Sequence, residues 1–486
     1  MTLTYAAACS DPNLFGPWFE GESWNTWRMM DKALFGLPLS APELKTFHEI
    51  CGNRDAPTQP VQECWLALGR RSAKTLKAAS LAVYQATIGA ELYGYKSKLT
   101  RGERGVVQFL GVDRDQAKVC FNYCLAFFEQ PMLAPLVKRT THDSIELTNN
   151  IALEITTADR RRVRGRTVIC AILDEVAHWR SENSSNPDED IYQSIKPAMA
   201  TIPNAFLLGI SSPYSRRGLL YRKLTDNWAK SGNVLAAKAP TWVMNPNLPR
   251  DGDFIAGEYE KDPAWASGEY GAEWREDIES FVGIDAVRAC IESGTRERLP
   301  ERRNRYTAFC DVAGGSGQDS YTLAIAHREA DTVVLDCIRE AKPPFSPEAV
   351  TEEFADLAKK YRITKVFGDR FGGEMPRELW RRHGINYEPA PKSKSQIYVD
   401  FLPLLNSGAV DLLEHDKLIN QLVSLERRRT RGGRDSIDHA PGGHDDVANS
   451  VCGALVTAMT KQRGREPWEN RHPTVEGLEK YDPLRP

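Results

Sequence analysis

The feature that most constrains the fold is an uninterrupted apolar run at 168–173 that ends in two acids, Asp174 and Glu175. A strand without a polar face is typical of strands buried on both faces of a parallel sheet. Short apolar runs alternate with amphipathic segments around it, as in α/β domains. We therefore predict strands at 64–68, 106–111, 168–173 and 205–210, and helices at 41–51, 74–88, 114–129 and 189–200.

A loop with the composition of a phosphate-binding loop follows the first of these strands. Such a loop wraps phosphates with its backbone N–H groups, and it needs a lysine for the outer phosphates and a hydroxyl for magnesium. Lys74 and Thr75 supply these groups, although Leu68 and Ala73 stand where glycines are usual. On this motif alone, an ordinary strand-to-helix turn is an equally good interpretation. The loop residues are Gly69, Arg70, Arg71, Ser72, Ala73, Lys74 and Thr75.

The acid pair favours a nucleotide site over the ordinary turn. Asp174 can hold magnesium through water, and Glu175 can activate the attacking water. An acidic helix cap after a strand is the plain alternative, but it does not explain a Lys-Thr loop upstream in the same domain. The strand at 205–210 is followed by Ser211 and Ser212, whose hydroxyls stand where they can sense a γ-phosphate. We predict ATP hydrolysis with Mg²⁺.

A second α/β pattern begins near residue 306, and acids stand at the ends of its elements. Carboxylates that converge from different elements can hold the metal ions, ~3.5–4 Å apart, of phosphodiester hydrolysis. Oxygen ligands favour Mg²⁺ or Mn²⁺ over zinc. A single strand-end aspartate is usually a turn residue, and an acid pair also favours a helix start. We predict a nuclease site built from Asp311, Asp369, Asp445 and Asp446, with Asp319 either a further ligand or a loop residue.

The elements of this second pattern can be placed from the same alternation. Strands are predicted at 306–311, 321–327, 332–338 and 363–368, and helices at 347–361, 394–406, 415–428 and 444–460. The chain is long enough for two or three domains. We expect an aromatic-rich N-terminal segment at 1–60, an ATPase domain at 61–245, a connector at 246–300, a nuclease domain at 301–460 and a mobile tail at 461–486.

Composition excludes several classes of protein. No apolar run approaches the ~20 residues that cross a bilayer, and the first residues lack the pattern of a signal peptide. The chain has 10 cysteines without CxxC pairs, which predicts reduced, buried thiols rather than disulfides or a zinc site. The net charge of −3 does not indicate a nucleic-acid binder. Arginine runs at 160–166 and 427–434 are either solvated faces or phosphate contacts, so charge leaves DNA binding undecided.

Taken together, the motifs resemble the large terminase subunit of tailed bacteriophages, over about 60–460 and in the order of that family. Members of that family have a divergent loop that often lacks the first glycine and has an arginine before the lysine. The resemblance implies an N-terminal P-loop ATPase domain of RecA/ASCE-like fold with a mainly parallel sheet, and a C-terminal nuclease domain of RNase H-like fold. It rests on GRRSAKT at 69–75, ILDE at 172–175, SSP at 211–213, CDVAGG at 310–315, FGDR at 367–370 and HDD at 444–446.

The resemblance also implies a role for each matched residue of the first site. Residues 69–75 would bind the nucleotide, with Lys74 on the phosphates, Thr75 and Asp174 on magnesium, and Glu175 as the base. Arg70 would contact the γ-phosphate. Arg164 would reach the site of a neighbouring subunit, or else is a surface or DNA-facing arginine. Adenine recognition is expected among the aromatics around Trp18 to Trp27, unless these are ordinary core residues.

In the second site, the resemblance implies that Asp311, Asp369 and Asp445 bind the nuclease metals, with Asp446 or His444 assisting. Which acid of the 445–446 pair ligates metal stays open. The resemblance implies that the protein is a motor that uses ATP to drive double-stranded viral DNA into a procapsid and that also cuts concatemeric DNA. Its implied partners are the DNA, the small terminase subunit and the portal protein, on which identical subunits form a ring. The implied location is the host cytoplasm, without a membrane.

Two other interpretations stay open. The first is a stand-alone repair or recombination nuclease with a regulatory ATPase domain, although no convincing helicase motifs follow the acid pair. The second is a structural adaptor with degenerate sites. Complete Lys-Thr, Asp-Glu and three-acid sets argue against the adaptor.

Overall fold

The computed structural model describes residues 3–157, 165–179, 184, 187–369, 373–429 and 435–460. The chain divides into two compact units, the first formed by Met1–Glu279 with Arg428–Arg434 and the second by Ser280–Arg427 with Asp435–Pro486. The division at residue 279 falls inside the segment 246–300 that we expected to be a connector. Much of that segment belongs to the first unit, where α11 (Asp253–Lys261) and α12 (Pro263–Glu269) share a small core.

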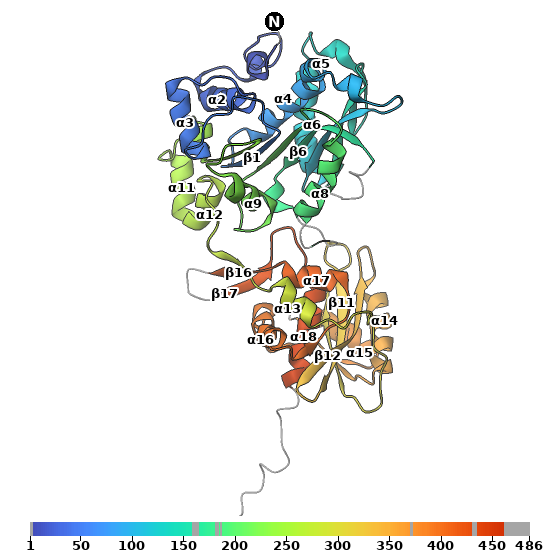
Figure 1. The fold of residues 1–486 in the computed structure, drawn as a ribbon. Coiled ribbons are helices and arrows are strands. Elements are labelled where there is room, and N and C mark those ends of the chain that lie inside the picture. The colour runs from blue at the N-terminus through green and yellow to red at the C-terminus, as the bar shows by residue number, and fades with distance from the viewer. Residues whose placement is uncertain are drawn as a thin grey trace, which may run out of the picture. The chain divides into compact units, whose positions relative to one another are not determined.

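The first unit is built on an eight-stranded sheet with the order β3-β4-β5-β2-β6-β7-β1-β8 (Figure 1). All neighbours from β5 to β8 in this order are parallel, whereas β3, β4 and β5 are joined by antiparallel pairs. The apolar run predicted as a doubly buried strand is β6, near the middle of the sheet. The strands are β1 Glu63–Leu68, β2 Gly105–Gly111, β3 Val137–Thr140, β4 Ser144–Leu147, β5 Ile151–Thr157, β6 Thr167–Asp174, β7 Phe206–Ser211 and β8 Val234–Ala239.

Helices pack on this sheet and share one large core with it. The helix that follows the loop, α4, is buried along most of its length. The Asp113 side chain caps α6 by accepting a hydrogen bond from the Gln116 N–H. The helices are α1 Tyr5–Ala8, α2 Asn25–Leu34, α3 Ala41–Cys51, α4 Lys74–Ala86, α5 Ile88–Leu92, α6 Arg114–Phe128, α8 Pro187–Met199, α9 Gly218–Asn227 and α10 Thr241–Met244.

The second unit has a six-stranded sheet with the order β14-β13-β10-β11-β12-β15. Strands β10, β11 and β12 form an antiparallel meander, and β13 and β14 continue the sheet parallel to β10. This mixed order confirms the expected α/β class of the second unit. The strands are β10 Tyr306–Asp311, β11 Tyr321–Glu329, β12 Thr332–Ala341, β13 Lys365–Gly368, β14 Asn386–Pro389 and β15 Val410–Asp411.

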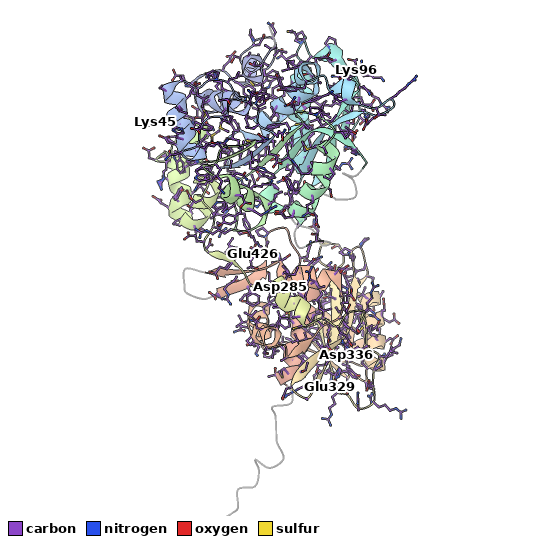
Figure 2. The ribbon with its side chains drawn as sticks, viewed as in Figure 1. Lys45, Lys96, Asp285, Glu329, Asp336 and Glu426 are labelled. Carbon is purple, nitrogen blue, oxygen red and sulfur yellow. The ribbon has the colours of Figure 1, made fainter. Side chains whose placement is uncertain are left out.

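Helices cover both faces of the second sheet (Figure 1). Helices α16 and α18 share a core with one face, and α14 and α15 share a core with the other. Asp336, labelled in Figure 2, lies on β12; its side chain is buried and is paired with His327 at 2.8 Å. The helices are α13 Ile284–Ala289, α14 Pro347–Lys360, α15 Glu374–Arg382, α16 Lys394–Asn406, α17 Asp416–Val423 and α18 Asp446–Thr460.

One predicted element is wrong in its second half. The helix expected at 415–428 ends at residue 423, and the chain continues as strand β16 (Leu425–Arg429). Strand β16 forms a small sheet in the order β17-β16-β9, with β17 at Asp435–His439 and β9 at Ile278–Ser280. Pairing between strands distant in sequence therefore overrides the local helical pattern.

Two compositional expectations can be compared with the structure. All the cysteines are free and buried, as expected of reduced core thiols. Among the described residues, no helix is both long enough and apolar enough to span a membrane. The tail at 461–486 lies outside the described residues.

Candidate functional site

The predicted phosphate-binding loop joins β1 to α4 in a tight, strained turn. Arg71 and Ala73 have positive φ angles of 66° and 60°. Side chains disfavour this left-handed conformation by roughly 1–2 kcal/mol per residue. A Cβ on Gly69 would collide with the Thr241 hydroxyl and lie 2.6 Å from the Tyr270 carbonyl oxygen, so only glycine fits there. Gly69 is therefore a position where the loop requires glycine. Ala73 stands where a second glycine is usual and adopts the left-handed conformation without one.

Sheet register brings the other predicted residues to this loop. Strand β7 pairs with β1 through Ser211 and Ala67, and with β6 through Ile210 and Asp174. All three strands are parallel, so their carboxyl ends meet at one edge of the sheet, where ligands bind in open α/β folds. The loop, the acid pair and the two serines are thus assembled in one place.

An ion pair lies at the centre of the site. Lys74 Nζ is 3.1 Å from Glu175 Oε1. The other Glu175 oxygen accepts hydrogen bonds from Ser211 Oγ at 3.0 Å and from the Ser212 N–H at 3.3 Å. Burial raises the pKa of Glu175, but the charges of Lys74 and His178 and the hydrogen bonds from Lys74 and Ser211 together outweigh burial and lower that pKa below its usual range. Glu175 is therefore held as a carboxylate, which is the form a general base needs.

The neighbouring acid has a different environment. Burial and the Glu175 charge raise the pKa of Asp174 to about 7. Thr75 Oγ1 donates a hydrogen bond to Asp174 Oδ2 at 3.3 Å, whereas the buried Asp174 Oδ1 has no hydrogen-bond partner. A hydroxyl beside an unpartnered carboxylate oxygen fits a hard divalent cation, which would also compensate the buried charge. Thr75 and Asp174, the two residues predicted to hold magnesium, therefore lie together.

Two contacts to this site have no signal in the sequence. Trp179 Nε1 donates a hydrogen bond to the Asp174 carbonyl at 2.9 Å, and His178 Nε2 lies 3.3 Å from Ser212 Oγ. Both residues follow the acid pair closely, but nothing about their type marks them as part of the site. They connect the acid pair to the serine pair.

The predicted arginines are less closely connected. The Arg70 side chain is 57% exposed, and its Nε lies 3.5 Å from Glu269 Oε2. Arg71 is also exposed, and Arg164 lies outside the described residues. The aromatics expected near adenine pack in or against the hydrophobic core. The ring centres of Trp18 and Phe127 are 4.7 Å apart, and Trp27 is 3% exposed.

The second predicted site is assembled at the carboxyl ends of β10 and β13. These strands are parallel neighbours, with Cys310 opposite Gly368, so Asp311 and Asp369 emerge side by side. Burial and the Asp369 charge raise the pKa of Asp311 well above its usual range, and Asp446 and Asp445 contribute in the same direction. Mutual repulsion of this kind requires a cation or hydrogen-bond donors to hold the carboxylates together.

Asn449, which sequence reasoning missed, is one such donor. Its Nδ2 donates hydrogen bonds of 2.8 Å to both Asp311 Oδ2 and Asp369 Oδ2, and its own buried Oδ1 has no partner. One available signal was its position on the predicted helix 444–460, four residues after Asp445 and hence on the same face. With all-oxygen donors around it, this centre fits Mg²⁺ or Mn²⁺.

The two acids at the start of α18 have different partners. Asp445 accepts a hydrogen bond from Tyr398 Oη at 2.8 Å, and Lys394 Nζ lies 3.1 Å from it. Asp446 accepts one from the Ser320 N–H at 2.9 Å. The Asp445 charge also raises the pKa of Asp369, after the larger effect of burial. One ligand atom each from Asp445, Asp438 and His439 lie within 4.8 Å of one another.

Asp446 belongs to a second group of potential ligands. One ligand atom each from Asp319, His444 and Asp446 lie within 4.8 Å of one another. His444 Nδ1 is 3.3 Å from Asp319 Oδ1. The candidate residues Asp319 and His444 thus lie together, beside Asp446.

Residues 44–272 match the family model described as "Uncharacterized protein MJ0330, N-terminal P-loop domain". The first unit therefore contains a P-loop domain, in agreement with the loop geometry. None of the curated proteins matches this chain.

Several solved structures are similar to it. The large terminase of bacteriophage HK97 is 15% identical, with a TM-score of 0.38, over 90% of this chain and 100% of that chain. The large terminase of a thermophilic bacteriophage, solved in complex with ADP, is 12% identical, with a TM-score of 0.37, over 87% and 100%. The large terminase nuclease of the thermophilic phage G20c, with bound magnesium, is 21% identical, with a TM-score of 0.32, over 36% and 96%.

Proposed function

We propose that this chain is the large subunit of a phage terminase. It uses ATP to move double-stranded viral DNA into a procapsid, and it cuts concatemeric DNA with a divalent metal. One observation carries the proposal: a P-loop site with a Lys74–Glu175 pair and a separate centre of buried acids lie in one chain, in the order that the sequence motifs of terminases have.

Each residue of the first site has a role in ATP hydrolysis. The loop N–H groups and Lys74 bind the phosphates, and Arg70, which is exposed, is able to reach outward to the γ-phosphate. Thr75 and Asp174 would hold Mg²⁺, which supplies charge compensation when bound. Glu175, kept ionised beside Lys74, takes a proton from the attacking water. Ser211 and Ser212 contact Glu175 directly and so link its state to β7.

The second site suits phosphodiester hydrolysis. Asp311, Asp369 and Asp445 would hold Mg²⁺ or Mn²⁺, which activates water and stabilises the developing charge. Asn449 keeps the first two carboxylates at a fixed separation. Asp446, with Asp319 and His444 close by, assists.

The proposed partners follow from the same resemblance. They are double-stranded DNA, the small terminase subunit, the portal protein and further copies of this chain in a ring on the portal, in the host cytoplasm. The main rival is a stand-alone repair or recombination nuclease with a regulatory ATPase.

A packaging reaction distinguishes the two. Procapsids that carry the matching portal are mixed with linear DNA, ATP and either the wild type or the Lys74→Ala variant, and DNA protected from added nuclease is measured. A packaging motor protects DNA only with the wild type and only with ATP. A repair nuclease protects none, although it cuts DNA in the same mixture.

A further inference from the structure

The backbone carbonyls of loop residues 70–72 each accept a hydrogen bond from a side chain outside the loop. The carbonyl of residue 70 accepts from Thr241 Oγ1 at 2.8 Å, and that of residue 71 from Asn245 Nδ2 at 3.0 Å. The carbonyl of residue 72 accepts from Trp27 Nε1 at 2.8 Å. We call Trp27, Thr241 and Asn245 the carbonyl clamp.

The clamp residues are themselves held in place. Thr241 begins α10 and Asn245 follows its end, and the Thr241 N–H donates to the Tyr270 carbonyl at 2.8 Å. Thr26 Oγ1, next to Trp27 on α2, donates to the Val243 carbonyl on α10 at 2.8 Å. A hydrogen bond therefore joins α2 to α10, the two helices beside which the clamp donors stand.

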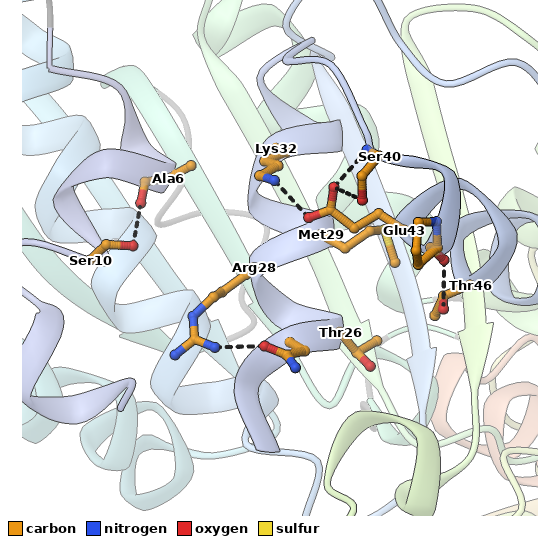
Figure 3. Close-up of a pocket in the computed structure, with 11 residues that line it drawn as sticks. Ala6, Ser10, Thr26, Arg28, Met29, Lys32, Ser40, Glu43 and Thr46 are labelled. Carbon is orange, nitrogen blue, oxygen red and sulfur yellow. Dashed lines mark hydrogen bonds and ion pairs between the residues drawn. The ribbon is translucent and has the colours of Figure 1, made fainter. Parts of the chain in front are cut away.

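Helix α2 is anchored on both of its sides. On the inner side, Asp31 forms a buried ion pair of 2.7 Å with Lys77 of α4, and the Lys77 ammonium lies 4.2 Å from the centre of the Phe19 ring. On the outer side, a pocket of about 320 Å³ separates α2 from the start of α3 (Figure 3). There Lys32 is paired with Glu43 at 2.6 Å. Breaking a buried pair such as the inner one is strongly unfavourable, so the position of α2 relative to α4 is fixed.

The geometry of the peptide bond gives these contacts a consequence for the nucleotide. In a planar trans peptide the C=O and the following N–H point in opposite directions. Holding the carbonyls of 70–72 outward therefore turns the N–H groups of 71–73 toward the inside of the loop. Within the part of the chain that the structure describes, these three N–H groups donate no hydrogen bond. They are the groups with which such a loop binds phosphate.

The sequence of this loop explains why it needs external support. Arg71 and Ala73 adopt positive φ angles without being glycines, so the loop does not keep this shape by its own preference. We propose that the carbonyl clamp consists of positioning residues that preorganise the loop for the β-phosphate of a nucleoside di- or triphosphate. The clamp acts through the loop backbone and does not touch the nucleotide. This inference rests on the proposed ATP site and adds the residues that shape it.

The test measures the Kd for ADP with Mg²⁺ on the full chain. Trp27→Phe removes the indole donor together with the five-membered ring and keeps an aromatic ring, and Thr241→Val replaces the hydroxyl by a methyl group. Each variant is expected to raise the Kd about 5-fold, the equivalent of one net hydrogen bond. The double variant is expected to raise it further than either single variant, because the two donors hold different carbonyls. In ATP hydrolysis, KM rises in parallel while kcat stays within about twofold, because Lys74 and Glu175 are untouched.

Two controls separate positioning from general stability. Thr241→Ser keeps the hydroxyl and is expected to restore the wild-type Kd. Trp380→Phe removes an indole donor to Tyr321, 3.1 Å away in the second unit, and leaves the Kd unchanged.

The outcomes distinguish this inference from the proposed function. If the wild type binds no ADP, or if Lys74→Ala binds it equally well, the proposed ATP site is wrong. If the wild type binds ADP through Lys74, but Trp27→Phe and Thr241→Val bind it within about twofold of the wild type, the clamp does not preorganise the loop. Loss of folding by Thr241→Val leaves Trp27→Phe as the deciding variant.

Discussion

Replacing Asn449 by leucine tests how the nuclease acids are held together. The side chain is fully buried, and leucine has a similar size, so the change removes the amide without opening a large cavity. Two hydrogen bonds to carboxylates are lost, each 2.8 Å long. Bonds to charged groups contribute about 1.5–3 kcal/mol each, and removal of the unpartnered Oδ1 returns about 1–3 kcal/mol. The expected net loss is about 2–3 kcal/mol in the absence of metal.

A divalent metal should offset much of this loss, because a cation between Asp311 and Asp369 replaces the amide as their common partner. Thermal unfolding is measured in EDTA and in Mn²⁺, for the wild type, Asn449→Leu and the control Ser450→Ala. The Ser450 hydroxyl is also buried, but it bonds within its own helix, to the Val447 carbonyl at 3.0 Å. Asn449→Leu should gain more from Mn²⁺ than either other protein. An equal loss of stability with and without Mn²⁺ would refute the reasoning.

Three further predictions concern the first unit. Lys74→Ala should lower ATP hydrolysis at least about 100-fold, because the phosphates lose their cation, while plasmid cleavage is unchanged in the same preparation. Gly69→Ala should abolish ADP binding, since its Cβ meets Thr241, whereas Gly257→Ala, with no atom within 4 Å of its Cβ, should bind normally in calorimetry. Burial raises the pKa of Glu63, but two lysine partners outweigh burial and lower it to about 2. The stability from this ion pair is therefore complete above the ordinary glutamate pKa of about 4.5 and is lost as pH falls toward 2. Acid unfolding of Glu63→Gln should show a shallower slope in that window, and an identical slope would contradict the prediction.

The sequence located both candidate sites because each depends on local signals. The acid pair at the end of β6 and the aspartates at the ends of β10 and β13 stand where an apolar run stops abruptly. Parallel pairing then brings such ends together without further information. The loop was recognisable from Lys74 and Thr75 despite its missing glycines.

The clamp was not predictable, for a physical reason. Trp27, Thr241 and Asn245 reach the loop from 45, 171 and 174 residues away in the sequence, and each is of a residue type that is common in cores and turns. Such contacts arise only when the sheet is assembled. The wrong second half of the helix expected at 415–428 has the same origin, because β16 lies between β17 and β9, and β9 is distant in sequence.

The central claim is that one chain carries two independent hydrolytic sites. The most direct test measures phosphate release from ATP and relaxation of supercoiled plasmid in Mg²⁺ and in Mn²⁺, for the wild type, Lys74→Ala and Asp311→Asn. The account predicts that Lys74→Ala loses only ATP hydrolysis and Asp311→Asn loses only cleavage. Cleavage that survives Asp311→Asn, or ATP hydrolysis that survives Lys74→Ala, would contradict it.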